Sequence, residues 1–343
     1  MMHERKLISL SHGAGGKEMG ELLRELIISK VKMSGFEEGI GLEDMDDSST
    51  IPLGDIHVTV TTDSYTVNPI FFPGGDIGKL AVTGTINDLA VMGARPLAIV
   101  DAMVVEEGFP MDDLKRIVSS MIHTAEGEGV ALIGGDFKVM PRKSLDKIII
   151  TTSGIGVVSR GALITDSGLR PGDKIIVTGT IGEHGATILA LQSGIDVGGT
   201  SLRSDCASIV EAMKIALELG GVHAAKDPTR GGLAMALNEM ARKSKVMIVL
   251  EEEKIPIRDE VRMYCEMLGI DPLYLACEGR AVIGASSEVA DDIVQKLNKA
   301  GYRDATVIGE VRKGREGYVL LRTVVGGIRI VEPPTGELVP RIC

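Results

Sequence analysis

The sequence of 343 residues contains no Trp, and only 3% of its residues are aromatic. A hydrophobic core must therefore be built mainly from Val, Ile, Leu, Ala and Met. No run reaches about 18 consecutive apolar residues, so we expect no membrane-spanning helix. Residues 1–16 lack a cationic segment followed by a long apolar run, and we therefore expect no secretory signal.

Cysteine and positive charge are also scarce. The four cysteines, at 206, 265, 277 and 343, form no CxxC pair, which indicates neither a disulfide framework nor a zinc site. A reducing cytoplasm is the expected compartment. With 37 Lys and Arg against 48 Asp and Glu, the formal net charge is -11. This charge argues against nucleic-acid binding, and it suits an enzyme whose carboxylates hold metal ions.

Runs of β-branched residues alternate with helix-like segments, which favours layered α and β structure. The chain length and the sequence GLRPGD at 168–173 predict two domains that divide there. In the first half we expect strands at 57–64, 97–105, 130–136 and 147–158, and helices at 75–93 and 111–129. In the second half we expect helices at 204–219, 231–243 and 289–300, and strands near 246–251, 280–285 and 304–310. The stretch 318–331 predicts a hairpin that turns at Gly326 and Gly327, followed by an extended, Pro-containing tail.

Two Gly-rich stretches are candidate anion sites. In LISLSHGAGGKEMGELL (7–23), Ser11 and Glu18 stand where a Walker A loop needs Gly and Ser or Thr, so a simple helix cap is an equal alternative. The stretch KDPTRGGLAMALNEM (226–240) is the stronger signal. Its two glycines expose N–H groups at a helix start, and its arginine adds a fork-shaped cation. Helix capping by its aspartate or threonine is the alternative.

Four aspartates of the first half suggest a metal site. Asp46 lies in EDMDDSST, Asp63 follows a β run, Asp88 lies inside an apolar helix-like segment, and Asp136 follows a strand and two glycines. Carboxylates are rarely buried unless they are paired or bind metal, and Mg²⁺ takes hard oxygen ligands and bridges phosphates. Each aspartate alone is better explained as the cap of a turn or helix, but the four together favour a metal site.

Several segments together resemble one family. They are SHGAGGK, NPIFFPGGDIGKLAVTGTINDLAVMGARP, GGDFKV, DPTRGGLA, CEGR and the final PRIC. In this order, and over essentially the whole chain, they resemble the HypE family of hydrogenase maturation proteins, which are carbamoyl dehydratases of the PurM-like (AIR synthetase-like) superfamily. The long second segment is the most specific to the superfamily, and PRIC selects the HypE family within it.

The resemblance implies an α/β (α+β) protein of two PurM-like domains. The expected divisions are a Gly-rich segment and helix at 1–35, an ATP-binding and dimerisation domain at 36–160 that pairs in a dimer β-barrel, an α/β domain at 170–326, and a strand with a mobile tail at 327–343. ATP with Mg²⁺ is expected in a dimer-related cleft. The implied partners are the carbamoyltransferase HypF, a HypC–HypD complex that accepts cyanide, and a second copy of the chain.

Carried over by position, the resemblance makes Cys343 the carrier of the carbamoyl group, Glu278 the base and Lys138 an active-site contact. The implied nucleotide contacts are Asp46, Asp63, Asp88, Asp136, Lys138, Asp227, Arg230, Gly231 and Gly232. The implied Mg²⁺ ligands are Asp46, Asp63, Asp88 and Asp136. Two residues depart from the family pattern: Phe137 stands where we expect a small hydroxyl residue, and Cys277 places a thiol beside the base.

Two other functions remain open at this point. A small-molecule kinase or synthetase of the same superfamily would use the same aspartates and would not need Cys343. Alternatively, the folded body is a non-catalytic scaffold and the tail is a peptide ligand for a partner's groove. Arg341 is a candidate for steadying the tail or its thiolate. The remaining cysteines are expected to be buried packing residues, and the spacing of the histidines supports no claim beyond structure.

Overall fold

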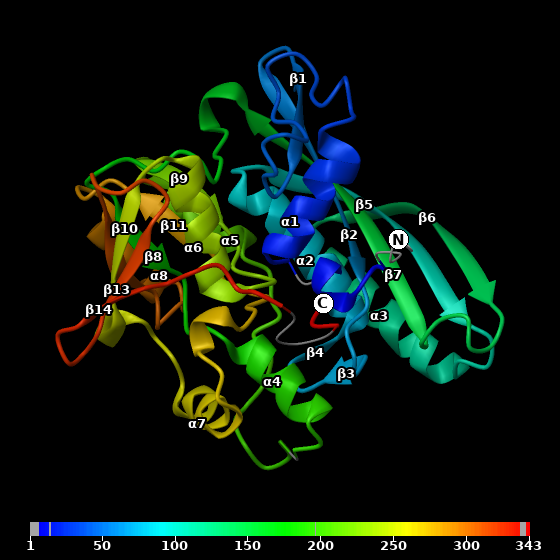
Figure 1. The fold of residues 1–343 in the computed structure, drawn as a ribbon. Coiled ribbons are helices and arrows are strands. Elements are labelled where there is room, and N and C mark those ends of the chain that lie inside the picture. The colour runs from blue at the N-terminus through cyan, green and yellow to red at the C-terminus, as the bar shows by residue number, and fades with distance from the viewer. Residues whose placement is uncertain (1–6, 14, 196, 337–340) are drawn as a thin grey trace, which may run out of the picture.

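The structure is a computed structural model that describes residues 7–13, 15–195, 197–336 and 341–343. Figure 1 shows two sheets on opposite sides of the molecule, with helix α2 and the C-terminal residues between them. Residues 337–340, which belong to the predicted tail, and residues 1–6 of the predicted N-terminal segment lie outside the described part. Within the described residues, no helix is long and apolar enough to cross a membrane.

The first half contains a five-stranded sheet in the order β1-β2-β7-β5-β6. All neighbouring pairs are antiparallel except β5 with β6. Two helices pack against this sheet. The strands and helices are β1 Ser49–Leu53, β2 Ile56–Tyr65, β3 Phe71–Phe72, β4 Gly75–Asp76, α2 Ile77–Val91, β5 Arg95–Glu106, α3 Met111–Gly127, β6 Ala131–Met140 and β7 Ile148–Ser159. Helix α1, Lys17–Leu23, precedes them. The four strands and two helices expected here are therefore confirmed.

The second half contains a seven-stranded sheet in the order β14-β13-β10-β12-β8-β11-β9. Its elements are β8 Lys174–Val177, α4 Glu183–Gln192, α5 Val210–Glu218, β9 Val222–Lys226, α6 Gly232–Lys243, β10 Met247–Glu251, α7 Asp259–Leu268, β11 Val282–Ala285, α8 Ala290–Lys299, β12 Thr306–Arg312, β13 Val319–Arg322 and β14 Ile328–Ile330. Single helical turns lie at Leu10–Gly13, Arg24–Ile28, Arg160–Ala162, Glu252–Lys254 and Pro272–Tyr274. The terminal hairpin is confirmed, since β13 and β14 pair antiparallel.

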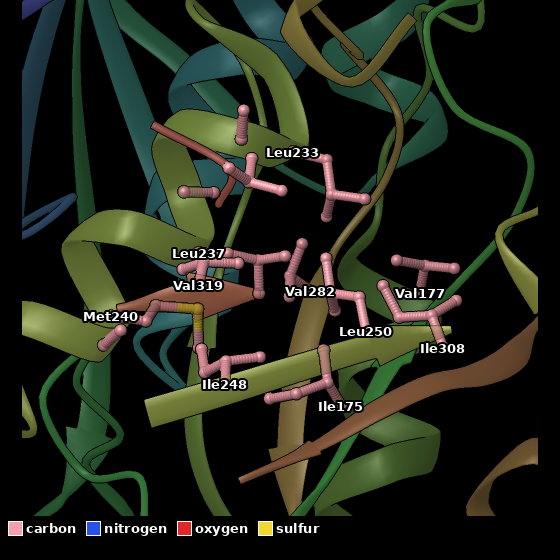
Figure 2. Packing of buried hydrophobic residues seen from close by; sticks show 14 of the residues in the cluster. Ile175, Val177, Leu233, Leu237, Met240, Ile248, Leu250, Val282, Ile308 and Val319 are labelled. Carbon is pink, nitrogen blue, oxygen red and sulfur yellow. The ribbon is translucent and has the colours of Figure 1, made fainter. Parts of the chain in front are cut away.

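The core of the second half lies between its sheet and helix α6. Figure 2 shows the side chains of Leu233, Leu237 and Met240 on this helix packed against strand residues that include Ile248 and Leu250. Helices α5 and α8 pack on the other face of the sheet. Burial of branched aliphatic side chains on both faces contributes roughly 25 cal/mol per Å², which is how a chain without Trp supports a core of this size.

Helix α2 is the element that positions the site. It is capped by Asp76, whose Oδ1 accepts hydrogen bonds from the N–H groups of Gly78 (2.8 Å) and Lys79 (3.0 Å). Thirteen of its fifteen residues are buried, because the helix lies between the first sheet and the second half of the chain. Its last turn brings Asp88 to strand β2, where Thr61 donates a hydrogen bond to the carboxylate at 2.8 Å.

One predicted helix begins later than expected. The segment 204–219 was expected to be helical throughout, but α5 starts only at Val210. Side chains accept hydrogen bonds from backbone N–H groups of the segment before α5. The hydroxyl of Ser204 accepts from the N–H of Cys206 at 3.0 Å, and Asn87 accepts from the N–H of Ile209 at 2.9 Å. Such local bonds compete with helix formation, and here they hold a loop between the two halves.

Candidate active site

A cavity of about 550 Å³ lies between the two halves of the chain. It is lined by the acidic segment 46–49, by strand β2, by Gly84 and Asp88 of α2, and by the loop that precedes α6. The site residues that the structure brings together here are Asp46, Asp63, Asp88, Asp227, Arg230, Glu278 and Cys343. With Asp47, which also lines the cavity, elements far apart in the sequence supply six carboxylates, one guanidinium and one thiol to it.

Asp88 lies on α2 at the wall of the cavity. Burial, reinforced by the negative charges of Asp63 and Asp227, raises its pKa well above the ordinary value. Asp63 follows Thr61 by two residues on β2, so the two side chains lie on the same face of the strand. A cation bound between these carboxylates would relieve their repulsion, so the donor set suits a hard divalent metal ion. Among the described residues, no group of three or more His, Cys, Asp or Glu side chains is already placed to hold a metal ion.

Asp46 is a half-buried carboxyl whose pKa is raised. Burial raises its pKa to about 7, and the charges of Asp166 and Asp47 push in the same direction. The backbone N–H of Asp166 donates to Asp46 at 3.2 Å, which ties the acidic segment to the second half. This carboxyl therefore binds or releases its proton near neutral pH.

A buried lysine that we did not predict supports the acidic segment. The Nζ of Lys226 lies 2.5 Å from Asp47, 3.5 Å from Asp166 and 3.4 Å from Glu239. One oxygen of Asp47 remains buried without a hydrogen-bond partner. Asp47 stands beside Asp46 in the sequence, and Lys226 begins the stretch that had been singled out. The sequence indicated Asp47 and Lys226 only through their nearness to predicted site residues. That they form an ion pair depends on how the two halves pack against each other.

The loop before α6 differs from the expected anion site in one respect. Gly231 and Gly232 adopt φ of 84° and 61°, and a Cβ at Gly232 would lie 2.5 Å from the carbonyl oxygen of Leu275. Glycine is required there for steric reasons. The N–H of Gly232 donates to the carbonyl of Thr229 at 2.9 Å, so this donor is already engaged. Neither glycine lines the carboxylate cavity; they line smaller cavities beside it.

Glu278 faces the cavity as expected for a base. Its side chain is buried, and its Oε1 has no hydrogen-bond partner. Burial raises the pKa of this carboxyl well above the ordinary value, the charges of Asp227 and Asp205 add to the effect, and Arg230 opposes it. An unpartnered buried carboxyl at a cavity wall is typical of a group that meets a ligand.

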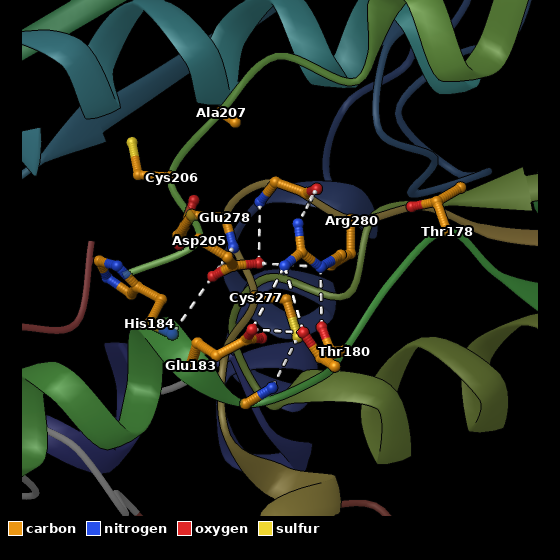
Figure 3. A network of polar contacts seen from close by, with 12 residues as sticks. Thr178, Thr180, Glu183, His184, Asp205, Cys206, Ala207, Cys277, Glu278 and Arg280 are labelled. Carbon is orange, nitrogen blue, oxygen red and sulfur yellow. Dashed lines mark hydrogen bonds and ion pairs between the residues drawn. The ribbon is translucent and has the colours of Figure 1, made fainter. Parts of the chain in front are cut away.

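A polar network below Glu278 holds its backbone (Figure 3). Asp205 accepts hydrogen bonds from the N–H groups of Glu278 (3.2 Å) and Gly279 (3.3 Å), and Arg280 pairs with Asp205 at 3.7 Å. The thiol of Cys277 accepts from the N–H of Gly182 at 3.2 Å and does not line the cavity. The departure at Cys277 therefore leaves the surroundings of the base unchanged.

The last residues of the chain are docked at this cavity. The Nη2 of Arg230 donates to the Sγ of Cys343 at 2.8 Å. Burial raises the pKa of the Cys343 thiol to about 11, with Arg230 acting against the rise. Cys343 also borders a second cavity of about 340 Å³, whose wall includes residues of the N-terminal segment such as His12. The thiol thus lies between two cavities, and only one of them carries the carboxylates.

Arg341 steadies the tail by two contacts. Its Nε donates to the carbonyl of Thr66 at 2.7 Å, and its guanidinium pairs with Asp146. Its backbone has a φ of 51°, which is uncommon for a residue with a Cβ. The contacts of the side chain hold this conformation, in agreement with one of the two roles considered for Arg341.

Asp136 and Lys138 lie elsewhere. Both are on the edge strand β6, where the Nζ of Lys138 is 2.6 Å from Asp136 and both side chains are largely exposed. The pair contributes nothing to the cavity of its own chain. Phe137 between them is 51% exposed. The strand register nevertheless places Gly135, which precedes Asp136, in the same row across the sheet as Asp63 of the cavity. In this row Asp63 pairs with Thr152, Thr152 with Asp101, and Asp101 with Gly135.

Comparisons with known proteins agree with this architecture. The N-terminal domain model of AIR synthase related proteins matches residues 45–158, and the C-terminal domain model matches residues 170–322. Carbamoyl dehydratase HypE of Rhodobacter capsulatus is 43% identical over 98% of this chain and 98% of its own length. The carbamoyl dehydratase HypE of Cupriavidus necator is 42% identical over 98% of this chain and 95% of its own length.

The chain belongs to the HypE family. A solved structure of HypE in complex with ATP is 38% identical, has a TM-score of 0.81 and matches 98% of this chain and 100% of that one. A HypE–HypF complex contains a chain that is 39% identical, with a TM-score of 0.84 over 93% of this chain and 100% of that one. The α/β fold of two AIR synthase related domains and the family membership are therefore established.

Proposed function

We propose that this chain is an ATP-dependent carbamoyl dehydratase that converts a carbamoyl group on its own Cys343 into a thiocyanate, and so supplies the cyanide ligand of [NiFe]-hydrogenase. The observation that carries the proposal is the position of the Cys343 sulfur, which lies against Arg230 at the wall of the carboxylate cavity. The names of the HypE relatives and the ATP complex of a HypE protein support it.

The chemistry needs an activated oxygen. Hydroxide is a poor leaving group from the thiocarbamate S–C(=O)–NH₂, whereas phosphate is a good one. The carbamoyl oxygen therefore attacks the γ-phosphorus of ATP, ADP leaves, and the ester S–C(OPO₃²⁻)=NH forms after loss of one N–H proton. Loss of the second N–H proton and departure of phosphate give S–C≡N. The sum is thiocarbamate plus ATP yielding thiocyanate, ADP, phosphate and one proton.

Residues of this chain have distinct roles in these reaction steps. Glu278 accepts the N–H protons, which requires its carboxylate form and contributes about 10²–10⁴-fold. The raised pKa of Glu278 makes it a strong base once it is ionised. Arg230 orients the sulfur and offsets negative charge that develops beside it. Burial of the docked tail excludes bulk water from the reactive ester.

Asp46, Asp63 and Asp88 are the proposed Mg²⁺ ligands, and the metal would neutralise and orient the phosphates of ATP. The mutual repulsion of these carboxylates and the unpartnered buried oxygens of Asp47 and Asp227 support a cation in this cavity. Asp227 and Arg230 remain proposed nucleotide contacts from the second half. Gly231 and Gly232 are proposed to act by shaping the turn that aims Arg230 at the cavity.

We propose that the protein works as a dimer and receives its carbamoyl group from HypF. The edge strand β6 exposes Ile133 (62%), Phe137 (51%) and Val139 (59%) together with its unpaired backbone edge, which is a surface that a second copy would cover. If two copies pair through β6 to form a β-barrel, Asp136 and Lys138 would belong to the cleft between the two copies. The HypE–HypF complex supports HypF as donor. The HypC–HypD complex is the proposed acceptor, and the four free cysteines suit a reducing cytoplasm.

Intact mass spectrometry tests the function directly. Full-length protein carbamoylated on Cys343 is incubated with ATP and Mg²⁺, and we expect the loss of one water from its mass together with ADP release. An unchanged mass would refute catalysis and favour the scaffold alternative. Deletion of Cys343 separates the second alternative, because a small-molecule kinase would retain ATP turnover and a carbamoyl dehydratase would lose it.

A further inference from the structure

The three last residues of the chain are held through their main-chain carbonyls. Thr66 donates its N–H to the carbonyl of Cys343 at 2.8 Å, and Asn68 donates its N–H to the carbonyl of Arg341 at 3.2 Å. Both donors belong to the first half, just after β2. The carbonyl between them, that of Ile342, accepts instead from the Nε2 of His184 at 2.7 Å. The second half therefore holds the tail by its main chain through a histidine side chain.

His184 is built into the second half as a rigid donor. It is the second residue of α4, it is fully buried, and its ring packs edge-on against Phe72 with a centroid distance of 5.4 Å. Its Nδ1 lies 2.7 Å from the hydroxyl of Ser204. That hydroxyl oxygen also accepts the N–H of Cys206 at 3.0 Å, so its own hydrogen is free to point at the imidazole.

The protonation state follows from these contacts. Burial lowers the pKa of His184, which keeps the ring neutral. A neutral imidazole has one N–H and one acceptor nitrogen. Because Ser204 donates to Nδ1, the hydrogen resides on Nε2, and that N–H donates to Ile342. The chain of donors from Cys206 through Ser204 to His184 thus ends on the tail.

We propose that His184 is a positioning residue that latches the carrier tail into the cleft, with Ser204 setting its tautomer. The Ile342 carbonyl belongs to the peptide group that joins Ile342 to Cys343, so its orientation sets the direction from which the thiol approaches Arg230. The Ile342 side chain is 6% exposed and packs in a hydrophobic cluster of the first half. His184 does not line the carboxylate cavity and has no contact with the reacting atoms.

The role of the latch rests on the proposed function, because a docked tail matters only if Cys343 carries the reacting group. Without the His184 donor, docking would bury the Ile342 carbonyl with no partner, whereas water would satisfy it in the undocked state. Loss of the donor therefore shifts the equilibrium toward the undocked tail. Dissociation of the tail is measurable without carbamoylation or nucleotide, because it exposes a thiol.

The test is the rate at which iodoacetamide alkylates Cys343 in the full-length protein, followed by mass spectrometry of the terminal peptide. The docked thiol reacts slowly because it is half-buried and its pKa is raised to about 11, and the other three cysteines are buried. His184→Phe keeps a ring against Phe72 and removes the N–H, so we expect roughly tenfold faster alkylation. His184→Gln retains an N–H donor and should restore most of the protection.

Two further variants complete the design. Ser204→Ala removes the hydroxyl that fixes the hydrogen of His184 on Nε2. Its rate of Cys343 alkylation should lie between those of wild type and His184→Phe. His223→Phe is the matched control: His223 lies on β9, bonded to Asp173 at 2.9 Å, and its substitution should leave the rate unchanged. If His184→Phe does not fold, Ser204→Ala decides the matter through the same measurement.

The proposal is overturned if Cys343 is alkylated at the same rate in His184→Phe and in wild type. It is also overturned if His184→Phe does not fold and Ser204→Ala is alkylated at the wild-type rate. A third contradicting result would be wild-type Cys343 that is alkylated as fast in the folded protein as in urea. The outcome is separable from the proposed function. Normal protection by His184 in a protein that forms no thiocyanate would refute the function and retain the latch. Thiocyanate formation with no dependence of alkylation on His184 would do the opposite.

Discussion

The guanidinium of Arg230 and the sulfur of Cys343 are 113 positions apart in the sequence and 2.8 Å apart in the structure. Arg230 extends from the loop before α6, and Cys343 reaches it at the end of the tail. Their contact joins the second half of the chain to the tail at the wall of the carboxylate cavity. It also gives the half-buried thiol a cationic neighbour, which opposes the rise in the thiol pKa that burial causes.

Arg230→Gln should slow thiocyanate formation roughly ten- to a hundredfold, because the sulfur loses a charged hydrogen-bond donor. Arg230→Lys keeps the charge and loses the fork, so it should fall between the two. Single-turnover mass spectrometry of carbamoylated protein measures the rate. Arg242→Gln, at the exposed end of α6, serves as the control. Equal rates for wild type and Arg230→Gln would exclude a role for the contact.

Glu278→Gln should slow the dehydration step by about 10²–10⁴-fold, because an amide of the same shape cannot accept the N–H protons. Nucleotide binding, measured by calorimetry, should stay close to wild type. The exposed Glu288→Gln variant controls for loss of one negative charge. A normal yield of thiocyanate from Glu278→Gln would remove Glu278 from the role of base.

Asp88→Asn should reduce ATP turnover by about 10²-fold or more, because the side chain keeps its volume but loses the charge that binds Mg²⁺. The hydrogen bond from Thr61 can persist, since an amide oxygen also accepts. The thermal midpoint should therefore not fall, and ADP release measures activity. Undiminished ADP release would show that Asp88 is not a metal ligand.

Stability of the metal-free protein should fall as pH rises through the range set by Asp46. The pKa of this group is raised in the folded state, from 3.8 to about 7. The folded state then binds the proton more tightly, so the associated stability is present below the unfolded value and is lost as pH rises to about 7. At about 1.4 kcal/mol for each pKa unit, the loss is roughly 4 kcal/mol.

Thermal melting of wild type and Asp46→Asn between about pH 5 and about pH 8 measures this effect. The variant cannot ionise, so its midpoint should vary less with pH over this window. Added Mg²⁺ should stabilise wild type most at the higher pH, where the carboxylates are ionised. Parallel pH profiles for the two proteins would show that Asp46 does not titrate as described.

Ile133→Asp on strand β6 should yield a monomer where the wild-type chain sediments as a dimer, because a charge cannot be buried cheaply in an apolar interface. Analytical ultracentrifugation measures the mass. Met267→Asp, on the exposed face of α7, is the control and should not change it. Sedimentation of the wild type as a monomer at micromolar concentration would refute the dimer.

The strand pattern of this protein could be predicted from residue type, because β-branched runs such as 147–158 and 97–105 have few other stable conformations. Helices α4 and α7 and strand β9 were not predicted. Helix α4 is buried on nearly all sides, so its sequence shows no apolar stripe with helical period. The start of α5 was misplaced because the side chains of Asn87 and Ser204 satisfy donors in the preceding loop.

The family, the carboxylates of the cavity and the thiol of Cys343 could be predicted from the sequence, because these depend on which residue types occur in which order. The folded structure was needed to see that Asp136 and Lys138 lie outside the cavity of their own chain, that Lys226 supports Asp47, and that His184 contacts the tail. These are contacts between residues far apart in the sequence. Their distances follow from how two sheets and one buried helix pack, and no local pattern of residues encodes them.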